Sequence, residues 1–124
     1  ILSKVTSKDK PIIDAAQAVT AQLQCLRTGE FKRAFAVNST ANQDRWCNCK
    51  QFVAVLRSHG DFKRLLDEEP ISVSLVGEKD SIATVRVSMP MKGVASVGLL
   101  WTMVAEASGD GGQTSWRTEK VGMA

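Results

Sequence analysis

The spacing of hydrophobic residues changes at Pro70, and this change restricts the folds open to the chain more than any other feature. Before Pro70 the apolar residues recur every three or four positions, which is typical of amphipathic helices. After Pro70 they alternate with polar residues, which is typical of strands. Helices followed by strands that are joined through tight turns predict an α+β domain with an antiparallel sheet.

The first helix is the clearest predicted element, and we expect it to run from about Lys10 to Thr28. Asp9 is its predicted N-cap, and Pro11 falls in the first turn, where its missing N–H does no harm. Gly29 can take the left-handed position that ends the helix. The apolar face consists of Ile12, Ile13, Ala16, Val19, Leu23 and Leu26.

Shorter helical segments follow, separated by a polar stretch. Residues 38–48 have the composition of an irregular loop. A third helix is predicted from Asn48, whose side chain caps it while Gln51 reaches back. Gly60 ends this helix, and Asp61 caps a further turn. The apolar positions are Phe31, Ala34 and Phe35 in the second helix, Phe52, Val55, Leu56 and His59 in the third, and Phe62, Leu65 and Leu66 in the last turn.

Four strands are predicted after Pro70, at residues 71–75, 82–89, 94–107 and 114 to about 121. The first two form a hairpin around a turn at 77–80. The third strand is long and apolar on both faces, which suits a central strand with one face under the helices. Residues 108–112 are the strongest turn signal in the chain.

These elements predict one soluble domain that comprises residues 1–124, with 1–9 as an N-terminal arm. A chain of this length buries about two thirds of its unfolded surface, so it needs no disulfide or metal for stability. We expect the N-terminal helices to pack on a curved four-stranded antiparallel sheet. A long helix on a bent sheet makes a half-open cone, lined inside by strand residues.

Several local motifs support this expectation. They are Leu23-Gln-Cys-Leu-Arg-Thr-Gly-Glu-Phe31, Ala34-Phe-Ala-Val-Asn-Ser-Thr-Ala-Asn42, Gln51-Phe52, Gly98-Leu-Leu-Trp-Thr-Met103 and Ser115-Trp-Arg-Thr-Glu-Lys-Val-Gly122. With the order of elements, they resemble the nuclear transport factor 2-like (NTF2-like, cystatin-like) superfamily, and in particular its uncharacterised family, domain of unknown function 4864. The resemblance implies the cone fold and no catalytic residues, since none are assigned in that family. The chain differs from it in Trp46-Cys-Asn-Cys49 and in a longer last turn.

Charge and hydropathy argue against two classes of partner. The 16 basic and 13 acidic residues are interspersed along the chain, and they leave a net charge of +3. Nucleic-acid-binding proteins usually cluster their basic residues, so no nucleic-acid partner is expected. The longest apolar stretch, 94–105, is shorter than the roughly 20 residues that a membrane-spanning helix needs. The chain is therefore not expected to span a membrane, although a peripheral place on a membrane complex is compatible with it.

The three cysteines bear on the compartment. Cys25, Cys47 and Cys49 do not make a disulfide framework, because their number is odd and Cys47 could pair with Cys49 only under strain. This favours an organellar reducing compartment, the plastid stroma ahead of the mitochondrial matrix, with the cytoplasm as the alternative. The sequence does not begin with Met, which fits either removal of a presequence or a trimmed chain.

No set of proton-transferring residues can be assembled from the sequence. An isomerase of the ketosteroid type needs a carboxylate base and hydrogen-bond donors for the developing negative charge. The chain has no tyrosine, and only Glu106 and Glu119 fall on predicted strands, near their ends. The single histidine, His59, is expected to cap its helix, with a general base as the alternative. Cys47, Cys49 and His59 lack zinc-site spacing, so no catalytic residue, cofactor or metal ligand is predicted.

Tryptophan residues supply the remaining candidates. Trp46, Cys47 and Cys49 form a candidate partner-contact loop, because an exposed tryptophan is a favoured interface anchor. The alternative is that Trp46 closes one end of the core. The candidate cavity-lining residues are Trp101, Trp116, Phe52 and His59. As neighbours on paired strands, the two strand tryptophans can instead simply fill the core.

Three functions remain open at this point. The first is a non-catalytic accessory or scaffold subunit that docks onto a larger assembly, for instance an organellar membrane-associated one, or forms a homodimer. The second is a protein that binds a small apolar ligand in the cone. The third is an enzyme of the isomerase or dehydratase type, which an inward-facing carboxylate or His59 with a shifted pKa would favour.

Overall fold

The computed structural model describes residues 13–58, 60–91, 94–107 and 114–123. Within these residues, helices precede a four-stranded antiparallel sheet, so the predicted α+β class is confirmed. The helices are α2 (Ala15–Arg27), α3 (Phe31–Ala36), α4 (Thr40–Trp46), α5 (Cys49–Ser58) and α6 (Gly60–Asp67). The strands are β1 (Ser72–Lys79), β2 (Ile82–Met91), β3 (Val94–Ala107) and β4 (Thr114–Met123), and they lie in this order across the sheet.

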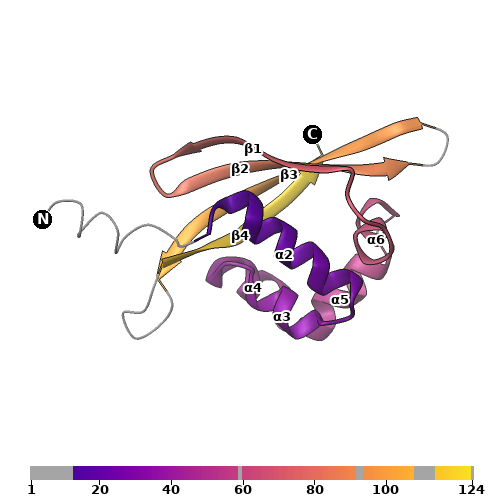
Figure 1. Cartoon of the computed structure of the whole chain (residues 1–124). Coiled ribbons are helices and arrows are strands. Elements are labelled where there is room, and N and C mark those ends of the chain that lie inside the picture. The colour runs from indigo at the N-terminus through magenta and orange to yellow at the C-terminus, as the bar shows by residue number, and fades with distance from the viewer. Residues whose placement is uncertain (1–12, 59, 92–93, 108–113, 124) are drawn as a thin grey trace, which may run out of the picture.

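The described helices lie on one side of the sheet, and α2 runs across it (Figure 1). α2 contacts β1, β2 and β4, and α4 contacts β4. Alternate strand residues are at most 2% exposed, namely Ala83, Val85, Val87 and Met89 in β2 and Leu99, Trp101 and Met103 in β3. They meet a helical stripe of Ala15, Ala18, Val19, Leu23 and Leu26. Full burial of each large apolar side chain stabilises the fold by about 1.5–3 kcal/mol.

Helix α2 begins later than predicted. Asp14 is extended, and its carboxylate accepts a hydrogen bond from the Gln17 N–H at 2.8 Å. The Gln17 side chain in turn accepts from the Asp14 N–H at 3.0 Å. This capping box marks the N-terminus of α2, so Ile13 and Asp14, which were predicted to lie inside the helix, do not belong to it. The predicted start near Lys10 lies outside the described residues. Residues 1–12, with the predicted arm and Asp9, lie outside the described residues, whereas Gly29 has the left-handed φ of 80° that was expected.

Helix α4 occupies the stretch that was predicted to be an irregular loop. Its N-cap Ser39 is extended and accepts from the Asn42 N–H at 3.1 Å. The helix has seven mostly polar residues, so it shows no apolar stripe from which a helix could be predicted. The loop prediction for 38–48 was therefore wrong. Asn48 does cap α5 as predicted, since its Oδ1 accepts from the Gln51 N–H at 2.9 Å.

Four further boundaries differ from the prediction. Gly60 is the first residue of α6 and not the end of α5, so Asp61 lies inside α6 and is not its cap. The β1–β2 turn consists of Asp80 and Ser81 instead of 77–80. Asp80 takes a left-handed φ of 58°, which aspartate tolerates better than most residues, so the turn needs no glycine. β2 and β4 both continue two residues past their predicted ends, and the predicted turn at 108–112 lies outside the described residues.

Candidate functional site

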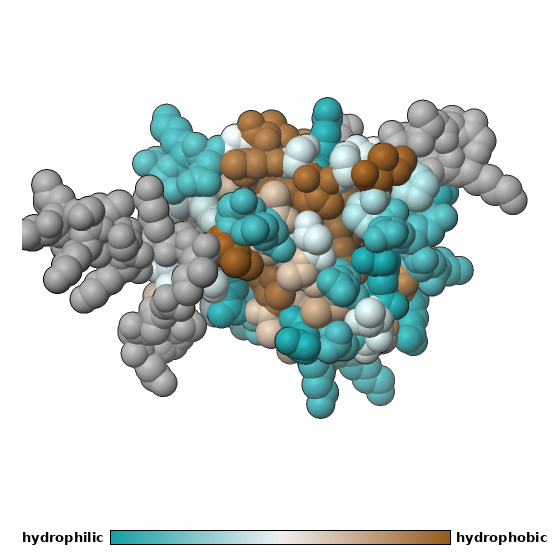
Figure 2. Space-filling view, viewed as in Figure 1, coloured by the Kyte–Doolittle hydropathy of each residue, from teal (hydrophilic) through white to brown (hydrophobic). Residues whose placement is uncertain are grey.

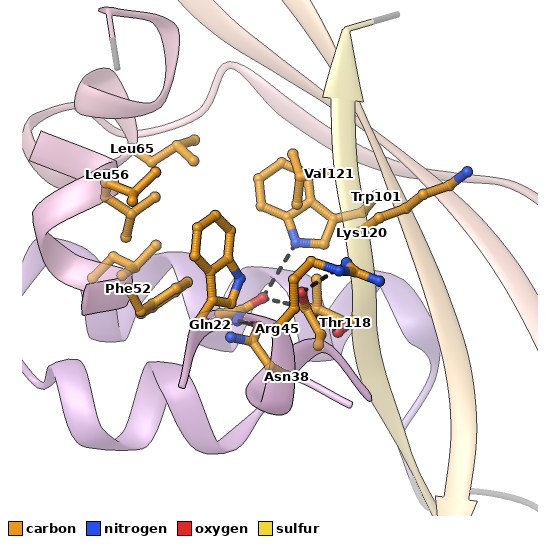
Figure 3. A pocket seen from close by; sticks show the side chains of 14 residues that line it. Gln22, Asn38, Arg45, Phe52, Leu56, Leu65, Trp101, Thr118, Lys120 and Val121 are labelled. Carbon is orange, nitrogen blue, oxygen red and sulfur yellow. Dashed lines mark hydrogen bonds between the residues drawn. The ribbon is translucent and has the colours of Figure 1, made fainter. Parts of the chain in front are cut away.

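A partly open cavity of about 130 Å³ lies between the helices and the sheet. Phe52, Leu56 and Leu65 on the helices face Trp101 and Val121 on the strands (Figure 3). The remaining lining residues are Leu26, Trp46 and Val55, and the polar residues Gln22, Asn38, Asn42, Arg45, Thr118 and Lys120. The lining is thus largely apolar, and two of its polar residues, Asn38 and Thr118, bond to Gln22.

Gln22 is a buried polar residue in the apolar stripe of α2, and its side chain makes every hydrogen bond open to an amide. Its Oε1 accepts from Trp101 Nε1 at 3.2 Å and from Thr118 Oγ1 at 2.6 Å. Its Nε2 donates to the Ala34 carbonyl and to Asn38 Oδ1, both at 2.9 Å. An amide has two donors and two acceptor positions, so Gln22 is fully satisfied and joins α2 to β3, β4 and the α3–α4 connection.

The partners of Gln22 determine which way the Asn38 amide faces. The Trp101 indole N–H can only donate and the Ala34 carbonyl can only accept, so the Gln22 oxygen must face Trp101. The Gln22 nitrogen then donates to Asn38, which has to present its oxygen. This leaves Asn38 Nδ2 without a hydrogen-bond partner among the described residues. Asn38 is only 1% exposed and is one of the lining residues, so one unused donor is buried beside the cavity.

A β-bulge in β4 determines which residues of that strand face the cavity. Thr118 lies opposite Met103, but Lys120 and not Glu119 lies opposite Thr102, so Glu119 is the additional residue. Without it, a regular ladder would place Lys120 opposite Trp101. With it, Val121 takes that position, and the Lys120 amine points away from Trp101 (Figure 3). The bulge therefore places an apolar residue, and not a charged one, opposite Trp101.

Helix α4 is held on β4 by bonds to Thr118 and Glu119. Ser39 Oγ donates to Glu119 Oε1 at 2.6 Å, and Asn42 Nδ2 donates to the Thr118 carbonyl at 3.1 Å. The Ser39 N–H also donates to that carbonyl at 2.8 Å. Arg45 lies 3.9 Å from Glu119 Oε2, and its side chain is 54% exposed, so solvent weakens this ion pair. Hydrogen bonds therefore hold α4 on β4 more than this ion pair does.

The predicted cavity-lining residues separate into three groups. Phe52 and Trp101 line the cavity. Trp116 is buried but lies opposite Ala105, and it is not among the lining residues. Trp101 lies opposite Val121, so the two strand tryptophans are not cross-strand neighbours. His59 lies outside the described residues.

The predicted partner-contact loop is organised differently from the prediction. Trp46 is the last residue of α4 and not part of a loop. It is half-buried in the cavity wall, with its ring edge-on to Phe52 at 6.2 Å between centroids. Cys47 is exposed with φ of 68°, and Cys49 is partly buried at the start of α5. The indole thus contributes to the cavity, whereas Cys47 is on the surface.

Titratable groups lie mostly away from the cavity. Among the described lining residues, none is Asp, Glu, His or Cys. Glu119 lies in the middle of β4 and not near its end as predicted, and Glu106 accepts from the Thr40 N–H at 3.1 Å.

In the described part of the chain, no three His, Cys, Asp or Glu residues are grouped so that they could hold a metal ion. No described helix is both long and apolar enough to cross a membrane.

The sequence prediction missed Gln22, Asn38 and Thr118. Gln22 carried a signal, because it falls three residues after Val19 and four before Leu26, within the apolar stripe. A polar residue in such a stripe needs buried partners. Nothing in the sequence indicated that Asn38 and Thr118, 80 positions apart in the chain, would be joined by a β-bridge.

Comparison with known proteins adds no assignment. No protein-family model matches the chain, and no curated protein or solved structure matches it either.

Proposed function

We propose that this protein binds a small, mostly apolar molecule that carries one hydrogen-bond acceptor. The observation that carries this proposal is the unpaired Asn38 Nδ2 beside a largely apolar cavity. A buried donor without a partner destabilises the fold by about 1–3 kcal/mol. A carbonyl, ether or nitrile group in the ligand would accept from it and remove this penalty, while Phe52 and Trp101 enclose the apolar part.

The size of the cavity restricts the ligand further. About 130 Å³ is close to the roughly 150 Å³ of an engineered apolar cavity that holds benzene. The ligand we propose is therefore one ring or a short branched chain with a single polar atom. Because Lys120 points outward and Arg45 contacts Glu119 and Asn42, a neutral acceptor suits the site better than a carboxylate.

We also propose that the chain is an NTF2-like cone. Support comes from the order of its elements, from the helices on one side of the sheet (Figure 1) and from a cavity between α5 and β3. Ligand cavities between a sheet and its covering helices are common, so this fold proposal and the binding proposal support each other.

Two isosteric probes test the binding proposal. Acetophenone and α-methylstyrene have nearly the same shape, but only acetophenone has a carbonyl acceptor. Titration followed by tryptophan fluorescence is expected to show binding of both, with acetophenone about tenfold tighter, since a hydrogen bond of this kind contributes about 1–1.5 kcal/mol. Equal affinities would contradict the role of Asn38, and no binding of either probe up to its solubility limit would contradict the proposal as a whole.

A matched pair of variants locates the binding. Val55→Trp places an indole where Val55 lines the cavity, whereas Ala54→Trp places the same group on the adjacent exposed position of α5, outside it. We expect Val55→Trp to abolish acetophenone binding and Ala54→Trp to leave it unchanged. Binding that survives in Val55→Trp would place the probe elsewhere.

We propose as a second candidate the accessory subunit expected from the sequence. Its specific support is an apolar edge: Leu75, Val76 and Ile82 are 44%, 61% and 53% exposed. β1 is the edge strand of the described sheet, and hydrophobic residues gather over this side of the molecule (Figure 2). Exposed apolar residues on an edge strand favour pairing with another chain. We propose that this edge pairs with a protein partner in a reducing organellar compartment or with a second copy of the chain.

Size-exclusion chromatography with light scattering tests this second candidate. Extract of the native source should contain the protein in a species larger than the monomer, and Val76→Lys expressed in that source should elute later. A wild-type protein found only as a monomer would contradict docking. This result would leave the ligand-binding proposal untouched, because Val76 does not line the cavity.

A further inference from the structure

A second hollow of the surface lies on the side of α5 that faces away from the cavity. Phe52, Val55 and Leu56 line the cavity, whereas Val53 and Arg57, one helical turn apart, line an open groove against α3. The groove has a volume of about 860 Å³. Helix α5, with ten residues, gives it a wall about 15 Å long, which is enough for a peptide segment of several residues.

Positive charge dominates this groove. Lys32, Arg33, Lys50 and Arg57 line it, and Glu30 is the one acidic residue among its lining residues. Glu30 accepts from Arg33 at 2.8 Å, and this hydrogen bond, together with one from Thr28, holds the pKa of its carboxyl below the usual value. In the described part of the chain, Lys32, Lys50 and Arg57 have no ion-pair partner.

The floor of the groove is apolar, and its aromatic ring is covered by an arginine. Val53 is buried there and Phe31 is partly buried. The Arg57 guanidinium lies 5.5 Å from the centre of the Phe31 ring, in a cation–π contact. Single-stranded nucleic acids bind by stacking their bases on free aromatic rings, and this ring is covered by Arg57. An occupant with apolar side chains between acidic ones fits the groove better.

We infer that this basic groove, lined by Phe31, Lys32, Arg33, Lys50, Val53 and Arg57, binds an acidic amphipathic segment of a partner protein. The segment's carboxylates pair with Lys32, Lys50 and Arg57, and its apolar residues cover Val53. Charge complementarity of this kind mainly speeds association and excludes wrong partners. The inference does not depend on a ligand in the cavity or on the β1 edge, since it uses the opposite face of α5.

A designed peptide tests this inference on the intact chain. The probe is a fluorescein-labelled decapeptide, Glu-Leu-Leu-Glu-Glu-Leu-Leu-Glu-Glu-Leu, and its control has Gln in place of every Glu. Fluorescence anisotropy is expected to show binding of the acidic peptide at least about tenfold tighter than of the Gln peptide, with affinity falling as salt rises from about 0.05 to 0.5 M. Equal binding of the two peptides, or binding that does not respond to salt, would overturn the inference.

Charge reversal locates the site. Lys50→Glu combined with Arg57→Glu should weaken acidic-peptide binding about tenfold or more. The matched control, Lys63→Glu combined with Lys79→Glu, makes the same change of charge at exposed positions outside the groove and should weaken it less than about twofold. Equal losses in both pairs would mean that only net charge matters. Tighter binding of a fluorescein-labelled single-stranded RNA than of the peptide, or dimerisation of the wild type that the groove variant abolishes, would also overturn the proposed occupant.

Discussion

Gln22 Nε2 donates to Asn38 Oδ1 at 2.9 Å, and this bond connects the stability of the core to the chemistry of the cavity. The orientation of Gln22 is fixed by Trp101 and by the Ala34 carbonyl, which are 67 positions apart in the chain. Asn38 receives its orientation from Gln22, and its unpaired nitrogen is buried beside the cavity. A change at either residue should therefore affect both folding and ligand choice, but in different proportions.

Gln22→Leu should destabilise the protein by roughly 2–4 kcal/mol, because it leaves the Trp101 N–H, the Thr118 hydroxyl and the Ala34 carbonyl without their buried partner. Urea unfolding followed by circular dichroism measures this difference. The control is Gln24→Leu, the same substitution at an exposed position of α2, for which a change within about 0.5 kcal/mol is expected. If both variants behave alike, the hydrogen bonds of Gln22 do not have the stabilising role described above.

Asn38→Asp should remove the preference for acetophenone over α-methylstyrene. The substitution keeps an oxygen for Gln22 but replaces the unpaired donor with a second oxygen, which cannot donate when ionised. The ratio of the two dissociation constants is expected to fall from about ten to about one or below. Using the ratio cancels any general loosening of the cavity, because both probes would lose affinity equally. A ratio that stays near the wild-type value would mean that another donor binds the carbonyl.

The sequence predicted the fold class because the change of hydrophobic period is a strong local signal. The stripe of Val19, Leu23 and Leu26 and the alternation in β2 are both buried as their spacing indicated. The predictions were wrong at elements that depend on hydrogen bonds and turn residues instead of on the spacing of apolar residues. Helix α4 is defined by the Ser39 cap and by its bonds to β4, and the β1–β2 turn is made by Asp80 without a glycine.

The cavity could be predicted only in part. Phe52 and Trp101 were predicted as lining residues from their hydrophobicity and their places on a helix and a strand. Asn38 was not, since its burial depends on the bridge to Thr118 across the chain. The bulge at Glu119 was also hidden, because an alternating pattern does not show where one additional residue shifts the register. Polar groups that depend on long-range pairing are thus the part of the site that the spacing of hydrophobic residues does not reveal.

Ser39→Ala should destabilise the protein by about 1–2 kcal/mol, because the hydroxyl both caps α4 and donates to Glu119. Since α4 contributes Asn42 and Trp46 to the cavity, acetophenone binding should weaken as well. Thermal unfolding and the fluorescence titration measure the two effects. Thr20→Ala is the control, as its hydroxyl is exposed and bonds only to a carbonyl of its own helix. A Ser39→Ala variant as stable as the Thr20→Ala variant would argue against the anchoring role of this cap.

The Glu30–Arg33 pair should make a small contribution to stability that depends on pH. Hydrogen bonds from Arg33 and Thr28 lower the pKa of Glu30 from its ordinary value of 4.5. A carboxyl whose pKa is lower in the folded than in the unfolded state stabilises the fold above the unfolded pKa. The contribution is lost as the pH falls through the folded pKa. Glu30→Gln should thus lower the Tm slightly at pH 7, and the difference from wild type should shrink as the pH falls below about 4.

A double-mutant cycle attributes this pH dependence to the pair. In the background of Arg33→Gln, the substitution Glu30→Gln should have a smaller effect on the Tm at pH 7, because the main hydrogen bond that lowers the carboxyl pKa is already absent. The remaining effect reflects the bond from Thr28, 3.0 Å away. Salt should reduce the effect in the wild-type background, since both side chains are largely exposed. A Tm difference that grows at acidic pH, or one that is unchanged when Arg33 is replaced, would show that Glu30 acts through some other contact.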